Sequence, residues 1–300
     1  MTRALSIIFL FAAGAAHSQD ARETKTPWIH TAEPLVLLSA NDGQSHQRFN
    51  AEMKLDTENV TKDSVSVVLL GPDHPPIVRT VYGTVPNTIS GSPHMAVTGD
   101  GRYGFVTSLG SGTSKGEPEN LMSVIDLASP DLTVIDRVEI PKPTMADAHP
   151  DGKRIIVPYA SGFRVFEMLN GKAAVVRDNP TDFSPGSIDV SPRGDRIIAT
   201  GRAGDGPEEV RLFSYEDGRV TPLAKVDDAA GRFRDPFSPR FSPDGARVLV
   251  LNGGGSGTKG ILDEVLVADV TTSSPRVAEV VPHVGDGLEA SRFTRAAASR

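Results

Sequence analysis

The chain contains no cysteine, and its charge is biased toward one sign. The lack of cysteine excludes a disulfide framework, a thiolate metal site and a cysteine nucleophile. Lys and Arg number 31 against 38 Asp and Glu, so the formal net charge is −7. An acidic chain without a basic cluster is poorly suited to nucleic-acid phosphates, and we expect no nucleic-acid partner.

Long hydrophobic runs are also scarce, and the single example lies at the N-terminus. Residues 4–16 read ALSIIFLFAAGAA, follow the positive Arg3 and precede the small-residue pattern Ala16-His17-Ser18. This arrangement predicts a signal peptide over residues 1–18, followed by a linker over 19–29. The run is shorter than the roughly 20 residues that span a bilayer. We therefore predict a periplasmic or secreted protein with no membrane span.

What the chain does contain is a repeated hairpin, among 29 Gly and 23 Pro residues. No apolar period of 3.6 residues and helical length interrupts it, which argues against helical repeats and βαβ units. The four copies are VTGDGRYGFVTS (97–108), AHPDGKRIIVPY (148–159), VSPRGDRIIATG (190–201) and FSPDGARVLVLN (241–252). Their turn glycines are Gly101, Gly152, Gly194 and Gly245, and a positive φ is expected at each of them.

Each hairpin copy belongs to a longer unit. The residues four before and four after the turn glycine are apolar in every copy, and two more strand signals usually follow the hairpin. Four strands in 40–50 residues are typical of β-propeller blades. The sequence therefore predicts an all-β propeller of four-stranded antiparallel blades over residues 30–293. The predicted units are an incomplete blade (30–88) and four full blades (89–141, 142–182, 183–232 and 233–285).

The C-terminal segment leaves two interpretations of the ring open. Residues 287–293, GLEASRF, resemble another first strand and could complete the first blade, which would close a five-bladed ring and remove its sheet edge. Alternatively, the chain is a shortened piece of a larger ring. The irregular tail over residues 294–300 has no propeller pattern and favours the second interpretation.

The repeats resemble a known group of propellers. The segments SVIDLASPDLTVIDRVEI (123–140) and GSPHMAVTGDGRYGFVTS (91–108) resemble YVTN-type and lactonase-type repeats, and FSPDGARVLV resembles TolB-type repeats. The resemblance covers roughly residues 89–293. It implies the propeller fold but not one activity, because such repeats occur in lactone hydrolases, surface-layer proteins, quinone-linked dehydrogenase subunits and scaffolds. The Trp-Asp dipeptide of WD40 repeats is absent.

Candidate site residues lie just upstream of each turn, because propeller sites form where the first strands converge at the channel mouth. The position five before the turn glycine is charged in three copies and in the C-terminal segment. These residues are Asp147, Asp189, Arg240 and Arg292. Their charges could bind an anionic or carbonyl ligand, or they could bridge adjacent blades.

His94 is the strongest single catalytic candidate. At a channel mouth it could act as a general base toward water that attacks a lactone, with Arg240 or Arg292 assisting. His283 and Glu289 could join it if the ring closes nearby. The alternative is that His94 is a hydrogen-bonded loop residue.

Other chemistries find little support in the sequence. The Gly/Ser-rich runs at 110–116 and 253–260 lack the spacing of a phosphate-binding loop. No metal-ligand spacing and no C-x-x-C-H motif occur, so we expect no metal and no cofactor. The sequence thus favours a binding or scaffold module that takes a small molecule or protein at the channel mouth, with a lactonase-like hydrolase as the alternative.

Overall fold

The computed structural model describes residues 29, 31–41, 62–86, 94–108, 120–228, 231–253 and 263–285. These residues form antiparallel sheets and no helix, which confirms the predicted all-β propeller. The predicted signal peptide, the glycine-rich run at 110–116, the segment 287–293 and the tail at 294–300 lie outside the described residues.

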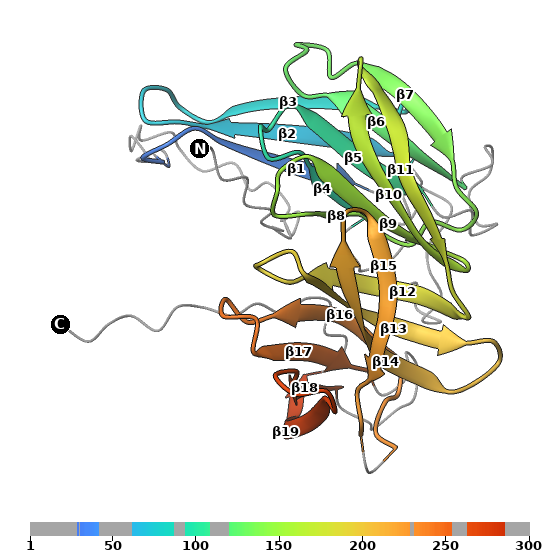
Figure 1. Ribbon diagram of the computed structural model, residues 1–300. Helices are drawn as coiled ribbons and strands as arrows, with labels where there is room; N and C mark the ends of the chain where they lie inside the picture. The colour runs from blue at the N-terminus through green and yellow to red at the C-terminus, as the bar shows by residue number, and fades with distance from the viewer. Residues whose placement is uncertain are drawn as a thin grey trace, which may run out of the picture.

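Five sheets follow one another along the chain (Figure 1). The first has three strands, β1 (Leu35–Asn41), β2 (Ser64–Leu70) and β3 (Ile77–Tyr82). The second has β4 (Met95–Val97), β5 (Tyr103–Ser108), β6 (Leu121–Asp126) and β7 (Val134–Glu139). The third has β8 (Asp147–Ala148), β9 (Arg154–Tyr159), β10 (Gly162–Leu169) and β11 (Lys172–Pro180). The fourth has β12 (Phe183–Val190), β13 (Arg196–Ala203), β14 (Glu208–Glu216) and β15 (Arg219–Lys225). The fifth has β16 (Pro236–Phe241), β17 (Arg247–Asn252), β18 (Asp263–Asp269) and β19 (Arg276–Gly285).

The repeated turn has the same geometry in all four copies. Gly101, Gly152, Gly194 and Gly245 have φ values of 72°, 75°, 75° and 71°. In each copy the amide of the turn glycine donates to the carbonyl three residues earlier, at 2.8 or 2.9 Å. The positive φ predicted for these glycines is confirmed, and a side chain would resist it at each of them.

The hydrophobic core lies between the sheets rather than in one centre. Each pair of neighbouring sheets encloses its own cluster of buried apolar side chains. Phe105 and Ile198, both from the apolar column after the turn, are 0% exposed and face the following sheet. Phe241, from the column before the turn, is 7% exposed and faces the preceding sheet. The two columns lie on neighbouring strands, and the register pairs Asp189 with Ile198 and Phe241 with Val248. Because paired residues share a face of the sheet, the register directs one apolar column toward each neighbouring sheet.

Polar contacts also connect each sheet to the next at the turns. The carbonyl oxygen of Gly152 accepts a hydrogen bond from the Gly99 amide at 2.7 Å, and Gly99 lies in the preceding turn. The carbonyl of Gly194 lies 2.9 Å from Nε2 of His149. The carbonyl of Gly245 accepts from Nη2 of Arg196 at 2.6 Å, although Arg196 is one sheet earlier. The turn carbonyls therefore join the sheets.

The inner strands β4, β8, β12 and β16 contact one another in chain order and line the inside of an arc. Figure 1 shows the first and fifth sheets at its two ends. The ring is not closed among the described residues. Closure by residues 287–293 stays a prediction, because that segment lies outside the described ranges.

Candidate functional site

A cavity of about 330 Å³ lies where the first strands of several sheets converge. Segment Ser184–Ser187 of β12, segment Thr200–Arg202 of β13 and segment 235–237 at the start of β16 line it. His94, Thr144 and Glu208 complete the lining. The cavity thus draws on residues in or beside the first strands of the second, third, fourth and fifth sheets. The sequence predicted a site where these strands converge, and we call this cavity the channel-mouth cavity.

His94 is held in place by the backbone of the next sheet. Its side chain is largely buried, with 9% of the residue exposed, and Nδ1 lies 2.5 Å from the carbonyl oxygen of Thr144. A carbonyl oxygen only accepts hydrogen bonds, so Nδ1 carries a proton. In a neutral imidazole the lone pair then belongs to Nε2. The carbonyl of His94 in turn accepts from the amide of Thr107 at 2.7 Å.

Charged groups stand on both sides of the cavity. Arg202, at the end of β13, forms an ion pair with Glu208, at the start of β14. Asp235 is exposed at the start of β16, and Phe237 beside it is half-buried. The cavity therefore offers a cation, two carboxylates, hydroxyls and one aromatic ring to a ligand.

Irregular backbone shapes the walls of the cavity. Strand β12 shifts register between Pro185 and Ser187, and the facing Gly201 has a φ of 154°. A Cβ atom on Gly201 would collide with the carbonyl oxygen of Ser184. Asp235, which also lines the cavity, has a φ of 55°, and Ser238, next to the lining residue Phe237, has a φ of 46°. Side chains rarely adopt such values. Backbone strain of this kind concentrates at functional sites.

The charged column predicted near the channel runs along the inner strands but does not line the cavity. Oδ2 of Asp147 accepts from the Val190 amide at 2.9 Å, and Oδ2 of Asp189 accepts from the Phe241 amide at 2.6 Å. Nη1 of Arg240 lies 3.2 Å from Oδ1 of Asp189. These contacts place Asp147, Asp189 and Arg240 between neighbouring sheets, as in the blade-bridging interpretation of the sequence.

The two aspartates are half-buried. Burial raises the pKa of Asp189 to about 7, against the opposing effect of Arg240, and the charge of Asp147 adds to the increase. Burial also raises the pKa of Asp147, with Arg240 again opposing. Two half-buried carboxylates thus lie near one guanidinium, and the repulsion between them disfavours their joint ionisation.

The structure therefore brings only part of the predicted site together. His94 lines the cavity, whereas Arg240 lies in the inter-sheet ion pair. Glu289 and Arg292, and the side chain of His283, lie outside what the structure describes. The roles proposed for all these residues stay predictions.

The sequence interpretation missed Arg202, Glu208 and Asp235. Arg202 stands eight residues after its turn glycine, where the other copies have Leu109, Ala160 and Gly253. The available signal was that Arg202 is the single charged residue at this position of the repeat. Glu208 is the first residue of β14, and Asp235 directly precedes β16. Neither carries a comparable signal, because each follows a connection whose length differs between blades.

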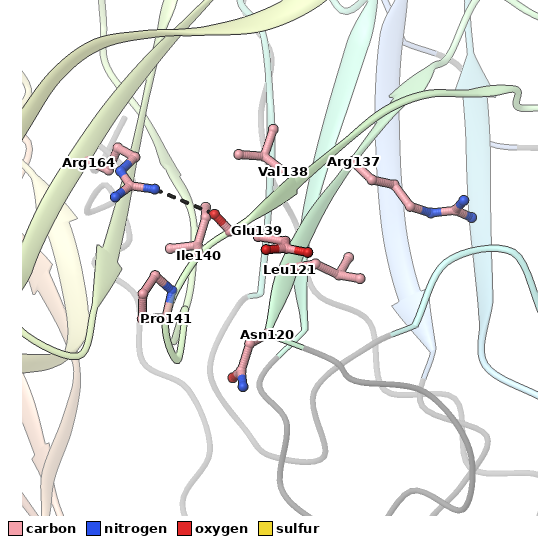
Figure 2. A pocket seen from close by; sticks show the side chains of 8 residues that line it. All are labelled: Asn120, Leu121, Arg137, Val138, Glu139, Ile140, Pro141 and Arg164. Atoms are coloured by element: carbon pink, nitrogen blue, oxygen red, sulfur yellow. Dashed lines mark hydrogen bonds between the residues drawn. The ribbon is translucent and has the colours of Figure 1, made fainter.

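A second cavity, of about 750 Å³, lies at the rim between the second and third sheets (Figure 2). Leu121, Val138, Ile140 and Pro141 supply an apolar wall. The guanidinium of Arg164 is directed toward the carbonyl oxygen of Glu139, 3.5 Å from Nη1, while Nη2 pairs with Asp178 at 3.1 Å. Arg137 extends away from the other labelled side chains. This cavity is larger, but its polar groups converge less than those at the channel mouth.

Within the described ranges, no three acidic or histidine side chains come together as metal ligands. The same ranges contain no helical segment that could serve as a transmembrane span. 

No family model matches the chain, and no curated protein matches its sequence. Solved structures do match it. The putative 6-phosphogluconolactonase of Bacteroides uniformis has a TM-score of 0.55 and 17% identity, over 76% of this chain and 67% of that one. For the periplasmic gluconolactonase of Pseudomonas aeruginosa the TM-score is 0.54 and the identity 17%, over 84% and 70%. The hydrazine synthase of Kuenenia stuttgartiensis has a TM-score of 0.53 and 17% identity, over 77% of this chain.

The match spans 64% of the hydrazine synthase chain, which is less than two thirds of its length. At such identities these similarities support the β-propeller fold and leave the function open.

Proposed function

We propose that the chain is an exported β-propeller that binds a small polar molecule in the channel-mouth cavity. The composition of that cavity carries the proposal. The ion pair of Arg202 and Glu208 lines it together with Asp235 and half-buried Phe237. Hydroxyl groups come from Thr144, Ser184, Ser187 and Thr200. Such a lining suits a ligand that has hydroxyl and carbonyl groups together with an apolar face.

The volume of the cavity limits the size of the ligand. At about 330 Å³ it lies near the lower end of the range of roughly 300–1,000 Å³ for small-molecule sites. A monosaccharide, a sugar acid or a compound of similar size fits this range. Export rests on the predicted signal peptide, and one of the similar structures is described as periplasmic.

A binding screen tests the proposal. We would measure heat release and the shift in Tm of the purified chain with monosaccharides, aldonic acids and aldonolactones. Asp235→Asn should weaken binding of any ligand found, because it removes one carboxylate while asparagine tolerates the same φ. Asp217→Asn is the matched control, since Asp217 has a φ of 47° and a side chain that is 90% exposed in a remote turn. If the two variants bind the ligand with equal affinity, the ligand does not bind in this cavity.

Lactone hydrolysis is a second candidate, favoured by the position of His94. With its Nδ1 proton directed to the Thr144 carbonyl, a neutral His94 carries its lone pair on Nε2, as a general base requires. Two of the similar structures bear lactonase names. In this proposal Arg202 is the cation that lines the cavity, and Glu289 and Arg292 stay untested candidates.

A panel of lactones separates the two candidates. A hydrolase would turn over at least one lactone and lose that turnover in His94→Gln, whereas ligand binding would persist. If the unsubstituted chain hydrolyses no lactone, the hydrolase proposal fails and the binding proposal is unaffected.

A further inference from the structure

The outer strand of the first sheet differs from the other four outer strands. Strands β7, β11, β15 and β19 each contain a register shift against the strand beside them. Strand β3 pairs with β2 in unbroken register over its six residues, from Ile77 to Tyr82. A bulge twists an edge strand away from further pairing, so only β3 presents a regular edge among the outer strands described.

The side chains of β3 are also more apolar and carry fewer charges than those of the other outer strands. Val78 and Tyr82 are 62% and 66% exposed, and Ile77 is 40% exposed. Its single charged residue, Arg79, donates to the carbonyl oxygen of Ser129 in the second sheet. Each of the other outer strands carries at least two charged residues, and three of them also contain proline, at Pro180, Pro222 and Pro282.

Charges and prolines on edge strands are common means of preventing strand addition. Strand β3 has neither protection on its exposed face. Within the described residues it pairs with β2 alone, and it lies at the end of its sheet.

We propose that β3 is a strand-addition surface that binds the β3 strand of a second copy of this chain. The two strands run antiparallel about a twofold axis and join two three-stranded sheets into one continuous sheet. Pro75 and Pro76 precede the strand and Gly83, with a φ of 71°, follows it. The pairing is therefore limited to the six residues of β3, because proline donates no backbone hydrogen bond.

The sequence of β3 is complementary to itself in one register. In an antiparallel pair, directly opposed residues both point their backbone groups toward the partner or both away from it. A twofold axis must therefore pass through a residue position rather than between two. With the axis at Thr80, Val78 lies opposite Tyr82 of the second copy, and the two threonines face each other.

These opposed pairs are favourable, since aromatic residues pair well with β-branched ones and threonines with each other. The neighbouring axis at Arg79 would place two arginines directly opposite each other, which is unfavourable. An axis at Val78 would place Thr80 opposite Pro76 and lose a hydrogen-bond donor. An axis at Val81 would pair only residues 80–82 of β3, so the axis at Thr80 gives the longest register without opposed charges. This self-complementarity favours a second copy over an unrelated strand.

Sedimentation of the purified chain tests the proposal. We expect a species with twice the mass of one chain that dissociates on dilution. Tyr82→Lys should abolish it, because two lysines would enter the interface. Leu223→Lys is the matched control, since Leu223 is 54% exposed on the bulged strand β15. A chain that remains monomeric at every concentration would overturn the proposal, as would a dimer that survives Tyr82→Lys.

Crosslinking gives an independent readout of the register, and the absence of native cysteine keeps it unambiguous. Thr80→Cys on the axis should form a disulfide-linked dimer under mild oxidation. The matched control is Thr221→Cys on β15, which should form no disulfide-linked dimer. Thr221 is exposed and lies opposite Ser214, just as Thr80 lies opposite Ser66. Equal crosslinking of both variants would contradict the pairing. Crosslinking of Thr80→Cys only to a different protein would overturn the second copy as the occupant.

Discussion

The carboxylate of Asp189 accepts a hydrogen bond from the backbone amide of Phe241, 2.6 Å away across the interface between the fourth and fifth sheets. Asp147 makes the same contact one sheet earlier, to the amide of Val190 at 2.9 Å. Each aspartate belongs to the inner strand of its sheet and binds the inner strand of the next. These side chains therefore connect neighbouring blades, and their role toward a ligand stays a prediction.

Asp189→Ala should destabilise the fold. It leaves the Phe241 amide and the guanidinium of Arg240 without their carboxylate partner in a half-buried region. We expect the free energy of unfolding to fall by about 1–3 kcal/mol, because two donors lose their shared, half-buried acceptor. Chemical denaturation measures this change. In the control Asp131→Ala, at an exposed residue without a positive φ, the change should stay within about 0.5 kcal/mol. Similar losses in both variants would contradict the argument.

The stability of the protein should depend on the charge of Asp189. Burial raises its pKa from 3.8 to about 7, so the native state holds a proton that the unfolded state releases between these values. The contribution of this group is therefore greatest below the unfolded pKa and is lost as pH rises through about 7. Unfolding measured between about pH 5 and pH 8 should show a steeper decline in stability for the unsubstituted chain than for Asp189→Asn. If the stability of the two proteins falls equally with pH, the raised pKa of Asp189 is contradicted.

Gly201→Ala should be much more disruptive than the same change at a nearby glycine. Gly201 has a φ of 154°, and a Cβ there would collide with the Ser184 carbonyl. Gly204 also has a positive φ, of 53°, but a Cβ there meets nothing within 4 Å. We expect a cost of about 1 kcal/mol at Gly204 and at least about 3 kcal/mol at Gly201, because only the latter forces the strands apart. Thermal unfolding compares the two variants, and equal Tm values would be inconsistent with the close approach.

Arg196→Met should weaken the junction between the fourth and fifth sheets. Nη2 of Arg196 donates to the Gly245 carbonyl at 2.6 Å, and Nη1 donates to the Val270 carbonyl at 2.8 Å. Methionine keeps much of the apolar packing but leaves both oxygens without this donor. The expected loss is about 2 kcal/mol in the free energy of unfolding. Arg193→Met, at a side chain that is 70% exposed, serves as the control and should cost little.

The repeat made most of the fold predictable. The recurrence of the turn glycines indicated four hairpins, and the strand signals after them placed four full blades and one incomplete blade where the sheets are found. The residues four before and four after the turn glycine are apolar in every copy, and Phe241 and Phe105 from these two columns are buried between sheets. These features repeat because every blade packs its two faces against neighbouring blades in the same way.

The cavity was only partly predictable for the opposite reason. His94 belongs to a repeated column and could be placed near the channel mouth. Arg202, near the end of β13, is the single charge in its column, and Glu208 and Asp235 belong to no repeated column. Chain distance gives no measure of how these three residues converge. The bulges that distinguish the outer strands were likewise invisible, because one extra residue in a strand leaves no mark in a pattern of short apolar runs.

The sequence by itself determined the all-β class, the blade boundaries and the conformation of the turn glycines, since these depend on local preferences repeated four times. Only the tertiary structure decided which charges bridge sheets and which face a cavity. Asp189 and Glu208 look equally polar in the sequence, yet one is tied to the next blade and the other lines the channel mouth. The difference arises because the contacts of each side chain come from strands about 50 residues apart or from irregular loops, and these meet only when the sheets pack.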